Sequence, residues 1–512
     1  MKTTNRILSL LLAALMLLPI LTGCGGSAEN PPEPPAGTAQ SPASEAPAPE
    51  TDPPVTEPPE YENPGKNYQG ETFTVAAVDY YAQGGGFWAA QKYCEAYTNE
   101  TTGDVLNDAI FERNNKVSDT LNVKLRTHSL TGYEHCAEEY RTILMSGDTS
   151  VDFCLMNGHN LPTFLGSGML QDLNTLERVD FSHSWWDQAS VEEFTILGSL
   201  FAVTGDVSLC VSLSPITYFF NKKIIADNNM DDPYQLVREG RWTVDKSIEM
   251  SRAAAKDLNG DGKIEPESDR FGMAIEALSL TYAIHSSGVR LTGRDADGAP
   301  YIDVDKERAS TVVDKLLPFY NDAGVTLFAD HITGYSNVFK ELFLPSLMEN
   351  RLLFFNNQLL VAMDLREMDS DFGILPPPKL DEAQSDYLCP ISTWWATFCI
   401  LPKTNTRLDI TSDTLEAMGF FSQQLVTPAF IEKSIQGKTL RDKESSEMLE
   451  LILHHRAYEI AAVYDWGEIN SMFTTMNRSG SSTFASTFEA SRKSAEKYLK
   501  KYVSELKKSM GN

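Results

Sequence analysis

Segments with the pattern of strands alternate with segments with the pattern of helices, and this alternation limits the chain to a few fold classes. Residues 71–78 alternate in polarity as a strand does, and residues 103–121 carry apolar side chains at helical spacing. A second helix is predicted over 136–147, with Gly147 at its end, and a short buried strand over 151–157. Strands that alternate with helices of this size are typical of βαβ units, so we predict a mostly parallel sheet covered by helices on both faces.

The same pattern returns later in the chain. The sequence predicts a strand leading into a helix at 214–225, a helix at 243–258 with Thr243 as its cap, and a strand at 270–275. An Asp-Gly turn between alternating segments predicts a hairpin at 289–304. This main part of the chain, about 446 residues, is long for one hydrophobic core and favours two lobes.

The N-terminus has the pattern of a secretory signal. Lys2 and Arg6 precede an apolar run that ends in Leu-Thr-Gly-Cys, with the cysteine at Cys24. Residues 21–24 resemble the lipobox of bacterial lipoproteins, which implies a signal peptide over 1–23 and an acylated Cys24 at the outer face of the cell membrane. The Pro/Glu-rich composition of 24–66 predicts a tether. A signal peptide with an unmodified cysteine is the alternative.

Charge and cysteine usage exclude several classes of function. The formal charge of −28 at pH 7 disfavours nucleic acid and anionic lipid as partners, because both bind clustered Lys and Arg. A Lys-rich amphipathic helix is nevertheless predicted at 489–509. The remaining cysteines contain no C-x-x-C pair, and buried free thiols are favoured over disulfides for them: Cys94, Cys136, Cys154, Cys210, Cys389 and Cys399.

Several segments, taken in order, resemble the extracellular solute-binding proteins, family 1, of ABC importers. They are GDVLNDAIFERNNKVSDTLNVKL (103–125), GSLFAVTGD (198–206), PITYFFNKKII (215–225), VREGRWTVDK (237–246), DLNGDGKIEPESDRFG (257–272), DFGILPPPK (371–379), TWWATFCILPK (393–403) and TPAFIEKSIQGKTLRDKESSEMLELI (427–452). The resemblance extends over nearly the whole chain from about residue 67, and its strength lies in the order of the segments.

The resemblance implies a two-lobed α/β fold of the periplasmic-binding-protein type II class. Lobe 1 would comprise residues 67–213 and about 391–430, and lobe 2 about 214–390 and 431–512. The chain would cross between the lobes and enclose a cleft that closes on a solute, most often a carbohydrate or oligosaccharide. The expected partners are this solute and the permease subunits of an ABC importer. The protein would act as a monomer, without a required cofactor or enzymatic activity.

Candidate ligand-binding residues follow from this placement, since a sugar site needs flat aromatic faces and planar polar groups. Some lie in the segments that resemble lobe crossings and others follow predicted strands. They are Trp394, Trp395, Asp206, Ser208, Asn157, His159, Asn356, Asn357, Tyr80 and Tyr81. Core packing, an exposed loop or a polar turn is the alternative for each of them. A second tryptophan pair, Trp185 and Trp186, is assigned mainly to packing.

Two other functions stay open on the sequence. A secreted glycoside hydrolase would need two carboxylates about 5 to 10 Å apart, and Asp465 with Glu468 is the most suggestive pair. No H-E-x-x-H, G-x-S-x-G or complete P-loop motif supports an enzyme. A surface adhesin would explain the tether but not the two-lobed pattern.

The stretch 257–270, DLNGDGKIEPESDR, has the pattern of a calcium loop. Its candidate metal ligands are Asp257, Asn259, Asp261, the Lys263 carbonyl, Glu265 and Asp269. Ser268 stands where a bidentate Glu is expected, and the loop follows a helix and precedes a strand. We expect a structural calcium ion in lobe 2, with a metal-free turn rich in Asp and Asn as the alternative.

Overall fold

The computed structural model describes residues 61–79, 88, 98, 100–366, 368, 371–431 and 442–509. The chain divides into the units Met1–Glu57 and Pro58–Asn512, and every described residue lies in the second. The predicted signal peptide, Cys24 and most of the tether lie outside the described residues. Among the described helices, none combines the length and the apolar character needed to cross a bilayer.

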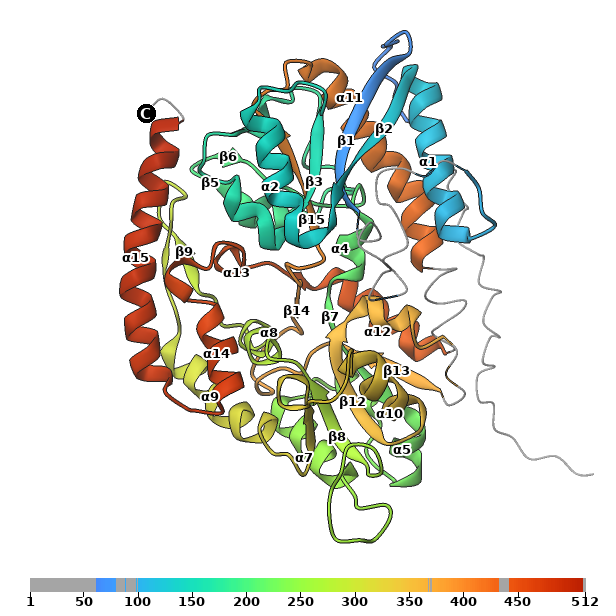
Figure 1. Cartoon of the computed structure of the whole chain (residues 1–512), viewed down its shortest axis with the longest axis vertical. Helices are drawn as coiled ribbons and strands as arrows, with labels where there is room; N and C mark the ends of the chain where they lie inside the picture. The colour runs from blue at the N-terminus through green and yellow to red at the C-terminus, as the bar shows by residue number, and fades with distance from the viewer. Residues whose placement is uncertain are drawn as a thin grey trace, which may run out of the picture. The chain divides into compact units, whose positions relative to one another are not determined.

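The first sheet combines strands from two separate stretches of the chain (Figure 1). It has five strands in the order β2 (Val123–Thr131), β1 (Glu71–Asp79), β3 (Phe153–Asn157), β15 (Thr397–Pro402) and β4 (Leu170–Gln171). β1 pairs in parallel with β2 and β3, whereas β15 is antiparallel to β3 and β4. The strands predicted at 71–78 and 151–157 are confirmed, and they are neighbours. The prediction of a mostly parallel sheet is wrong, because β15 returns from the other lobe and pairs antiparallel with both of its neighbours.

Helices around the first sheet follow from local sequence signals. They are α1 (Val105–Leu121), α2 (Gly132–Met145), α3 (Gln188–Phe194) and α11 (Leu408–Phe421). The Asp104 side chain caps α1 by accepting from the backbone N–H groups of Leu106 and Asn107, and Asn122 ends α1 in the left-handed region. The apolar side chains of α1 face the core, because they recur at helical spacing.

The second sheet repeats this arrangement with a different stretch of chain. Its five strands are β11 (Thr326–Phe328), β8 (Phe271–Ile275), β12 (Leu352–Gln358), β7 (Ile216–Asn221) and β13 (Phe372–Leu375), in that order. β8 is parallel to β11 and β12, and β7 is antiparallel to β12 and β13. Each sheet thus has one antiparallel strand next to its edge strand, inserted where the chain enters from the other lobe. The two-lobed α/β fold class is confirmed.

Helices and a hairpin surround the second sheet as predicted. Thr243 caps its helix by accepting from the backbone N–H of Lys246, and β9 pairs antiparallel with β10. The helix predicted to reach residue 258 ends at Ala254, because Lys256 pairs with Arg270 as an isolated bridge. The elements are α5 (Lys222–Asp227), α6 (Pro233–Arg238), α7 (Val244–Ala254), α8 (Ser279–Ser286), β9 (Thr292–Arg294), β10 (Pro300–Ile302), α9 (Lys306–Tyr320), α10 (Leu344–Met348) and α12 (Lys443–His454).

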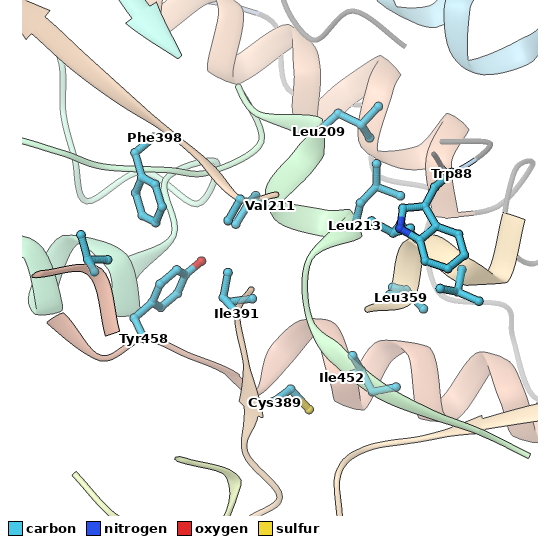
Figure 2. Packing of buried hydrophobic residues seen from close by; sticks show 14 of the residues in the cluster. Trp88, Leu209, Val211, Leu213, Leu359, Cys389, Ile391, Phe398, Ile452 and Tyr458 are labelled. Carbon is cyan, nitrogen blue, oxygen red and sulfur yellow. The ribbon is translucent and has the colours of Figure 1, made fainter. Parts of the chain in front are cut away.

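Among the described residues, three segments lie where the chain passes between the two sheets. The first runs through α4 (Leu209–Leu213), the second through β14 (Cys389–Pro390), and the third through β16 (Arg456–Ala457), which pairs with β14. Figure 2 shows Val211 of α4 near Ile391 and Phe398, and Leu213 near Trp88 and Leu359, so apolar side chains pack around these crossings. The last helices are α13 (Ile460–Tyr464), α14 (Ser471–Ser479) and α15 (Phe484–Ser509).

Short elements complete the unit. They are η2 (Gly158–Thr163), η3 (Leu173–Thr175), β5 (Thr195–Ile196), β6 (Ser199–Leu200), η4 (Ala329–His331), η5 (Phe339–Phe343), η6 (Leu359–Met363), η7 (Ser422–Val426) and η9 (Trp466–Glu468). The prediction of buried free thiols is confirmed for every cysteine in the described residues: Cys136, Cys154, Cys210, Cys389 and Cys399. Cys94 lies outside the described residues. Trp186 is buried in the core, as predicted.

Candidate ligand-binding site

Strands from both sheets end at the same crossing segments. β15 begins at a crossing and is antiparallel to β3, so Thr397 pairs with Asn157, the last residue of β3. β7 begins at another crossing and is antiparallel to β12, so Ile216 pairs with Gln358, the last residue of β12. The carboxyl ends of β3 and β12 therefore meet the crossings from opposite sheets, and such strand ends are where open α/β sheets bind ligands.

A cavity of about 360 Å³ lies at this junction. Its volume is within the range of small-molecule sites. The wall combines residues of α8, of the second and third crossings, and of the segment before α14. The lining residues are Leu278, Thr281, Tyr282, His285, Gly288, Val289, Arg290, Leu388, Pro390, Ile391, Thr393, Trp394, Ala457, Tyr458, Glu459, Ala462 and Asn470.

Trp394 forms an aromatic part of the wall and is stacked on His159. The two ring centroids are 3.7 Å apart with an angle of 17° between the planes. The backbone N–H of His159 donates to the carbonyl oxygen of Thr393 at 2.8 Å, which fixes the start of η2 against the second crossing. Burial lowers the pKa of His159, so the ring is neutral at neutral pH. The structure thus brings two predicted site residues, His159 and Trp394, together.

Asn157 holds the backbone of Trp394 in place beside this stack. Its side chain is fully buried, and its amide donates to the Trp394 carbonyl oxygen at 3.3 Å while its Oδ1 accepts from Asn160 at 2.9 Å. These contacts occupy the amide within the protein. The geometry makes Asn157 a positioning residue for Trp394 instead of a wall residue of this cavity.

The second sheet contributes polar groups through α8. The Tyr282 hydroxyl donates to Ser392 Oγ at 3.3 Å, and His285 Nε2 is hydrogen-bonded to Asn470 Oδ1 at 2.8 Å. Burial lowers the pKa of His285, which keeps this imidazole neutral as well. The wall therefore presents hydroxyl, imidazole and amide groups together with the rings of Tyr282, Tyr458 and Trp394.

The two charged residues of the wall neutralise each other. Arg290 Nε lies 3.2 Å from Glu459 Oε2, and the same guanidinium donates to Glu193. Glu459 also accepts from the backbone N–H of Leu291 and from the Thr292 hydroxyl. Since Glu193 belongs to α3 beside the first sheet, Arg290 ties the two lobes together at the cavity edge. Within the described wall no charge is left without a partner.

Glu276 is a functional candidate that the sequence analysis missed. It directly follows β8 and stands two residues before Leu278, at the carboxyl end of the second sheet. Burial raises the pKa of its carboxyl group to about 7, and nearby Asp330 adds to the rise, whereas Arg478 and Gln358 oppose it. An acidic residue right after the buried strand FGMAI is the signal that could have identified it.

Of the predicted ligand residues that the structure describes, Trp394 alone lines this cavity, and His159 stacks on its ring without being part of the wall. Ser208 is fully buried and bonded to Thr397 at 2.7 Å, and Asp206 accepts from Gln423 at 3.1 Å and Thr427 at 3.0 Å. The pKa of Asp206 is raised by burial. Trp395 packs against the core, and Asn356 and Asn357 are buried within β12. Tyr80 and Tyr81 lie outside the described residues. Ligand contact by these residues stays a prediction.

The candidate calcium loop is held by its own hydrogen bonds. Asp257 accepts from the backbone N–H groups of Gly260 (2.6 Å) and Gly262 (2.9 Å), and Asp261 accepts from Lys263 (2.9 Å). Asp269 accepts from the N–H of Leu258 and from that of Glu265, both at 2.8 Å. Across the described residues, no group of three or more His, Cys, Asp or Glu side chains is arranged to hold a metal ion. Calcium at Asp257, Asn259, Asp261, Lys263, Glu265 and Asp269 stays a prediction.

Neither a protein-family model nor a curated protein sequence matches the chain. Solved structures, in contrast, match most of the chain. A cyclic α-maltosyl-1,6-maltose binding protein of Arthrobacter globiformis gives a TM-score of 0.56 at 13% identity, over 84% of this chain and 100% of its own. An ABC substrate-binding protein of Listeria monocytogenes, in complex with cycloalternan, gives 0.52 at 12% identity, over 86% and 99%. UgpB of Mycobacterium tuberculosis, in complex with glycerophosphocholine, gives 0.53 at 15% identity, over 79% and 97%. The chain therefore has the two-lobed fold of the solute-binding proteins of ABC transporters.

Proposed function

We propose that the protein belongs to the extracellular solute-binding proteins, family 1, and captures a neutral carbohydrate or oligosaccharide between its lobes for an ABC importer. The observation that carries the proposal is the cavity at the lobe crossings, walled by aromatic rings and neutral polar groups. Aromatic faces cover the C–H side of a sugar ring, and hydroxyl, amide and imidazole groups hydrogen-bond its hydroxyls.

The charge balance of the wall favours a neutral solute. An anionic ligand needs an available cation, but Arg290 is already bonded to Glu459 and Glu193. The imidazoles of His159 and His285 have lowered pKa values and supply no positive charge. One similar structure holds glycerophosphocholine and another holds cycloalternan, so the fold alone does not determine which ligand is bound. The choice of solute class therefore rests on the residues of the cavity wall.

Capture would proceed by closure of the lobes. A solute that contacts Trp394 on one side and α8 on the other touches both lobes at once. It stabilises the closed arrangement by its differential affinity for that state. A micromolar site corresponds to about 8 kcal/mol of binding free energy. Stacking on Trp394 together with several directed hydrogen bonds would supply it.

A thermal-shift panel tests the solute class. The panel contains neutral mono- and oligosaccharides, uronic acids, phosphates, amino acids and peptides, applied to the chain starting at Gly25. A neutral sugar at 100 times its dissociation constant should stabilise the protein by about 2.7 kcal/mol. The shift should be lost in Trp394→Ala and kept in Tyr301→Ala, which removes an exposed ring elsewhere on the second lobe. Stabilisation by anions or peptides alone would contradict a neutral carbohydrate.

The cellular setting is also part of the proposal. A lipid on Cys24 would anchor the protein at the outer face of the cell membrane, and the tether would let it reach the permease subunits as a monomer. Metabolic labelling with a fatty acid tests the anchor. Label should be incorporated into the natural chain and lost in Cys24→Ser. Label retained in that variant would place the modification elsewhere.

We propose a binding function instead of catalysis. The Asp465 side chain accepts from the backbone N–H groups of Asn470 (2.8 Å) and Ser471 (3.0 Å), so it orders the start of α14. A structural acid of this kind supports assigning the Asp465 and Glu468 pair to folding. Turnover of a fluorogenic glycoside that disappears in Asp465→Asn while the fold persists would refute the binding assignment.

A further inference from the structure

The last helix presents a continuous stripe of lysines to solvent. α15 is 26 residues long and runs along one edge of the unit in Figure 1. At 3.6 residues per turn, six exposed lysines fall within a sector of about 120° and along about 22 Å of helix. We call them the lysine stripe: Lys493, Lys497, Lys500, Lys501, Lys507 and Lys508.

The stripe takes no part in holding α15 to the protein. The opposite face of the helix is buried through Ala495, Leu499, Tyr502 and Leu506. Among the described residues, the stripe makes a single ion pair, from Lys501 to Glu505 at 3.7 Å. The ammonium groups of the other five lysines thus extend outward without an ion pair to a described residue, although Glu496 and Glu505 flank the stripe on the same helix.

This concentration of positive charge is unexpected in a chain with a formal charge of −28. A solvated helix face is the simplest explanation for scattered charges, but such a face normally mixes both signs. Here Arg492 and the six lysines outnumber two glutamates, Glu496 and Glu505, between residues 492 and 508, so this part of the helix carries a clear excess of positive charge. Repulsion among these lysines is unfavourable, and an anionic surface facing the stripe would offset it.

We propose that the lysine stripe docks on the anionic lipid headgroups of a bilayer. The sequence argument against anionic lipid used the net charge, which describes the whole molecule and not this face. At physiological salt the Debye length is about 8 Å, so carboxylates on distant faces do not cancel the stripe. A straight row of flexible lysines matches a flat, polyanionic surface, because the stems extend and place the ammonium groups among the headgroups. Docking would lay α15 along the bilayer.

Vesicle sedimentation with the chain from Gly25, which lacks any lipid, tests this surface directly. The vesicles are phosphatidylcholine alone or with about one third phosphatidylglycerol. The stripe variant K493Q/K497Q/K500Q/K507Q should lose more than about tenfold in partitioning to the anionic vesicles, since each lysine near such a surface contributes several-fold. The matched variant K116Q/K124Q/K340Q/K443Q removes four exposed lysines elsewhere and should bind like the natural chain.

The dependence of vesicle binding on salt concentration distinguishes the effect of the lysine stripe from that of the total charge of the protein. Binding should be strongest near 0.15 M salt. It should be lost near 1 M, where the Debye length is about 3 Å. It should also weaken near 0.01 M, where the Debye length of about 30 Å lets the bilayer sense all the acidic residues. Absence of binding by the natural chain, equal binding to neutral vesicles, or equal loss in both variants would overturn the proposal. These outcomes leave solute binding untouched, so the two proposals fail independently.

Discussion

Replacing Glu276 by glutamine tests the acid beside the candidate site whose pKa is raised most strongly. Glutamine keeps the shape and the hydrogen-bonding groups of the side chain but cannot ionise. The pKa of Glu276 rises from 4.5 to about 7 on folding. The folded protein therefore keeps a proton on this carboxyl at pH values where the unfolded chain has already lost it.

The sign of the stability change follows from this raised pKa. The contribution of Glu276 is fully present below pH 4.5 and is lost as the pH rises through about 7. The shift corresponds to up to about 3 kcal/mol between these limits. Compared with the natural chain, Glu276→Gln should therefore gain relative stability, up to about 3 kcal/mol, between pH 5 and pH 8.5.

Urea unfolding at half-unit steps of pH measures this difference. Other buried acids and histidines titrate in both proteins, so only the difference between variant and natural chain reports on Glu276. Glu450→Gln, an exposed position on α12, serves as the matched control and should show a difference that does not change with pH. A flat difference for Glu276→Gln would refute the reasoning, because it would mean that this carboxyl ionises as it does in water.

Further predictions concern the cavity, the loop and the fold. Arg290→Gln should destabilise the protein by about 2 kcal/mol in urea unfolding, since it leaves two buried glutamates without their cation. Arg141→Gln, which removes an exposed ion pair, should have a much smaller effect, and equal effects would contradict the bridge. Trp394→Ala should weaken sugar affinity at least about tenfold by calorimetry, and unchanged affinity would remove the ring from the site. A chelator should lower the melting temperature by a few degrees, with recovery in calcium, if the loop at 257–269 holds a metal ion; an unchanged value would favour the metal-free turn. Gly205→Ala should cost about 3 kcal/mol, because its Cβ would lie 2.2 Å from a backbone carbonyl oxygen; a neutral effect in urea unfolding would contradict this packing.

The sequence was most informative where structure is decided locally. The capped helix after Thr243 and the apolar stripe of α1 depend on neighbours a few residues away, and both were predicted. The pairing of β15 with β3 places Cys399 opposite Leu155. These residues are far apart in the sequence, so no local pattern predicts the pairing. The resemblance to a known family placed residues 391–430 in lobe 1 but did not specify this pairing.

The candidate site was only partly predictable, because side-chain direction at a strand end depends on packing. Asn157 and His159 are two residues apart, yet Asn157 faces the Trp394 backbone while His159 stacks on the Trp394 ring. Ser208 was placed near a crossing correctly, but its hydroxyl bonds to Thr397 in the core. Glu276 was overlooked because its place right after the strand FGMAI is a weak signal in a chain rich in acids, and its raised pKa depends on groups distant in the sequence, such as Asp330 and Arg478.

The place of β15 in the first sheet has a consequence for folding during synthesis and export. β15 lies between β3 and β4, but its residues, Thr397–Pro402, follow the whole of the second sheet in the chain. During synthesis, which starts at the N-terminus, all strands of the second sheet are available before β15, so the first sheet must wait with the position between β3 and β4 unfilled. Contacts over such long sequence separations form slowly. The sheet that begins the sequence is thus expected to be completed last, and a chain cut short before residue 397 would contain every strand of the second sheet but not of the first.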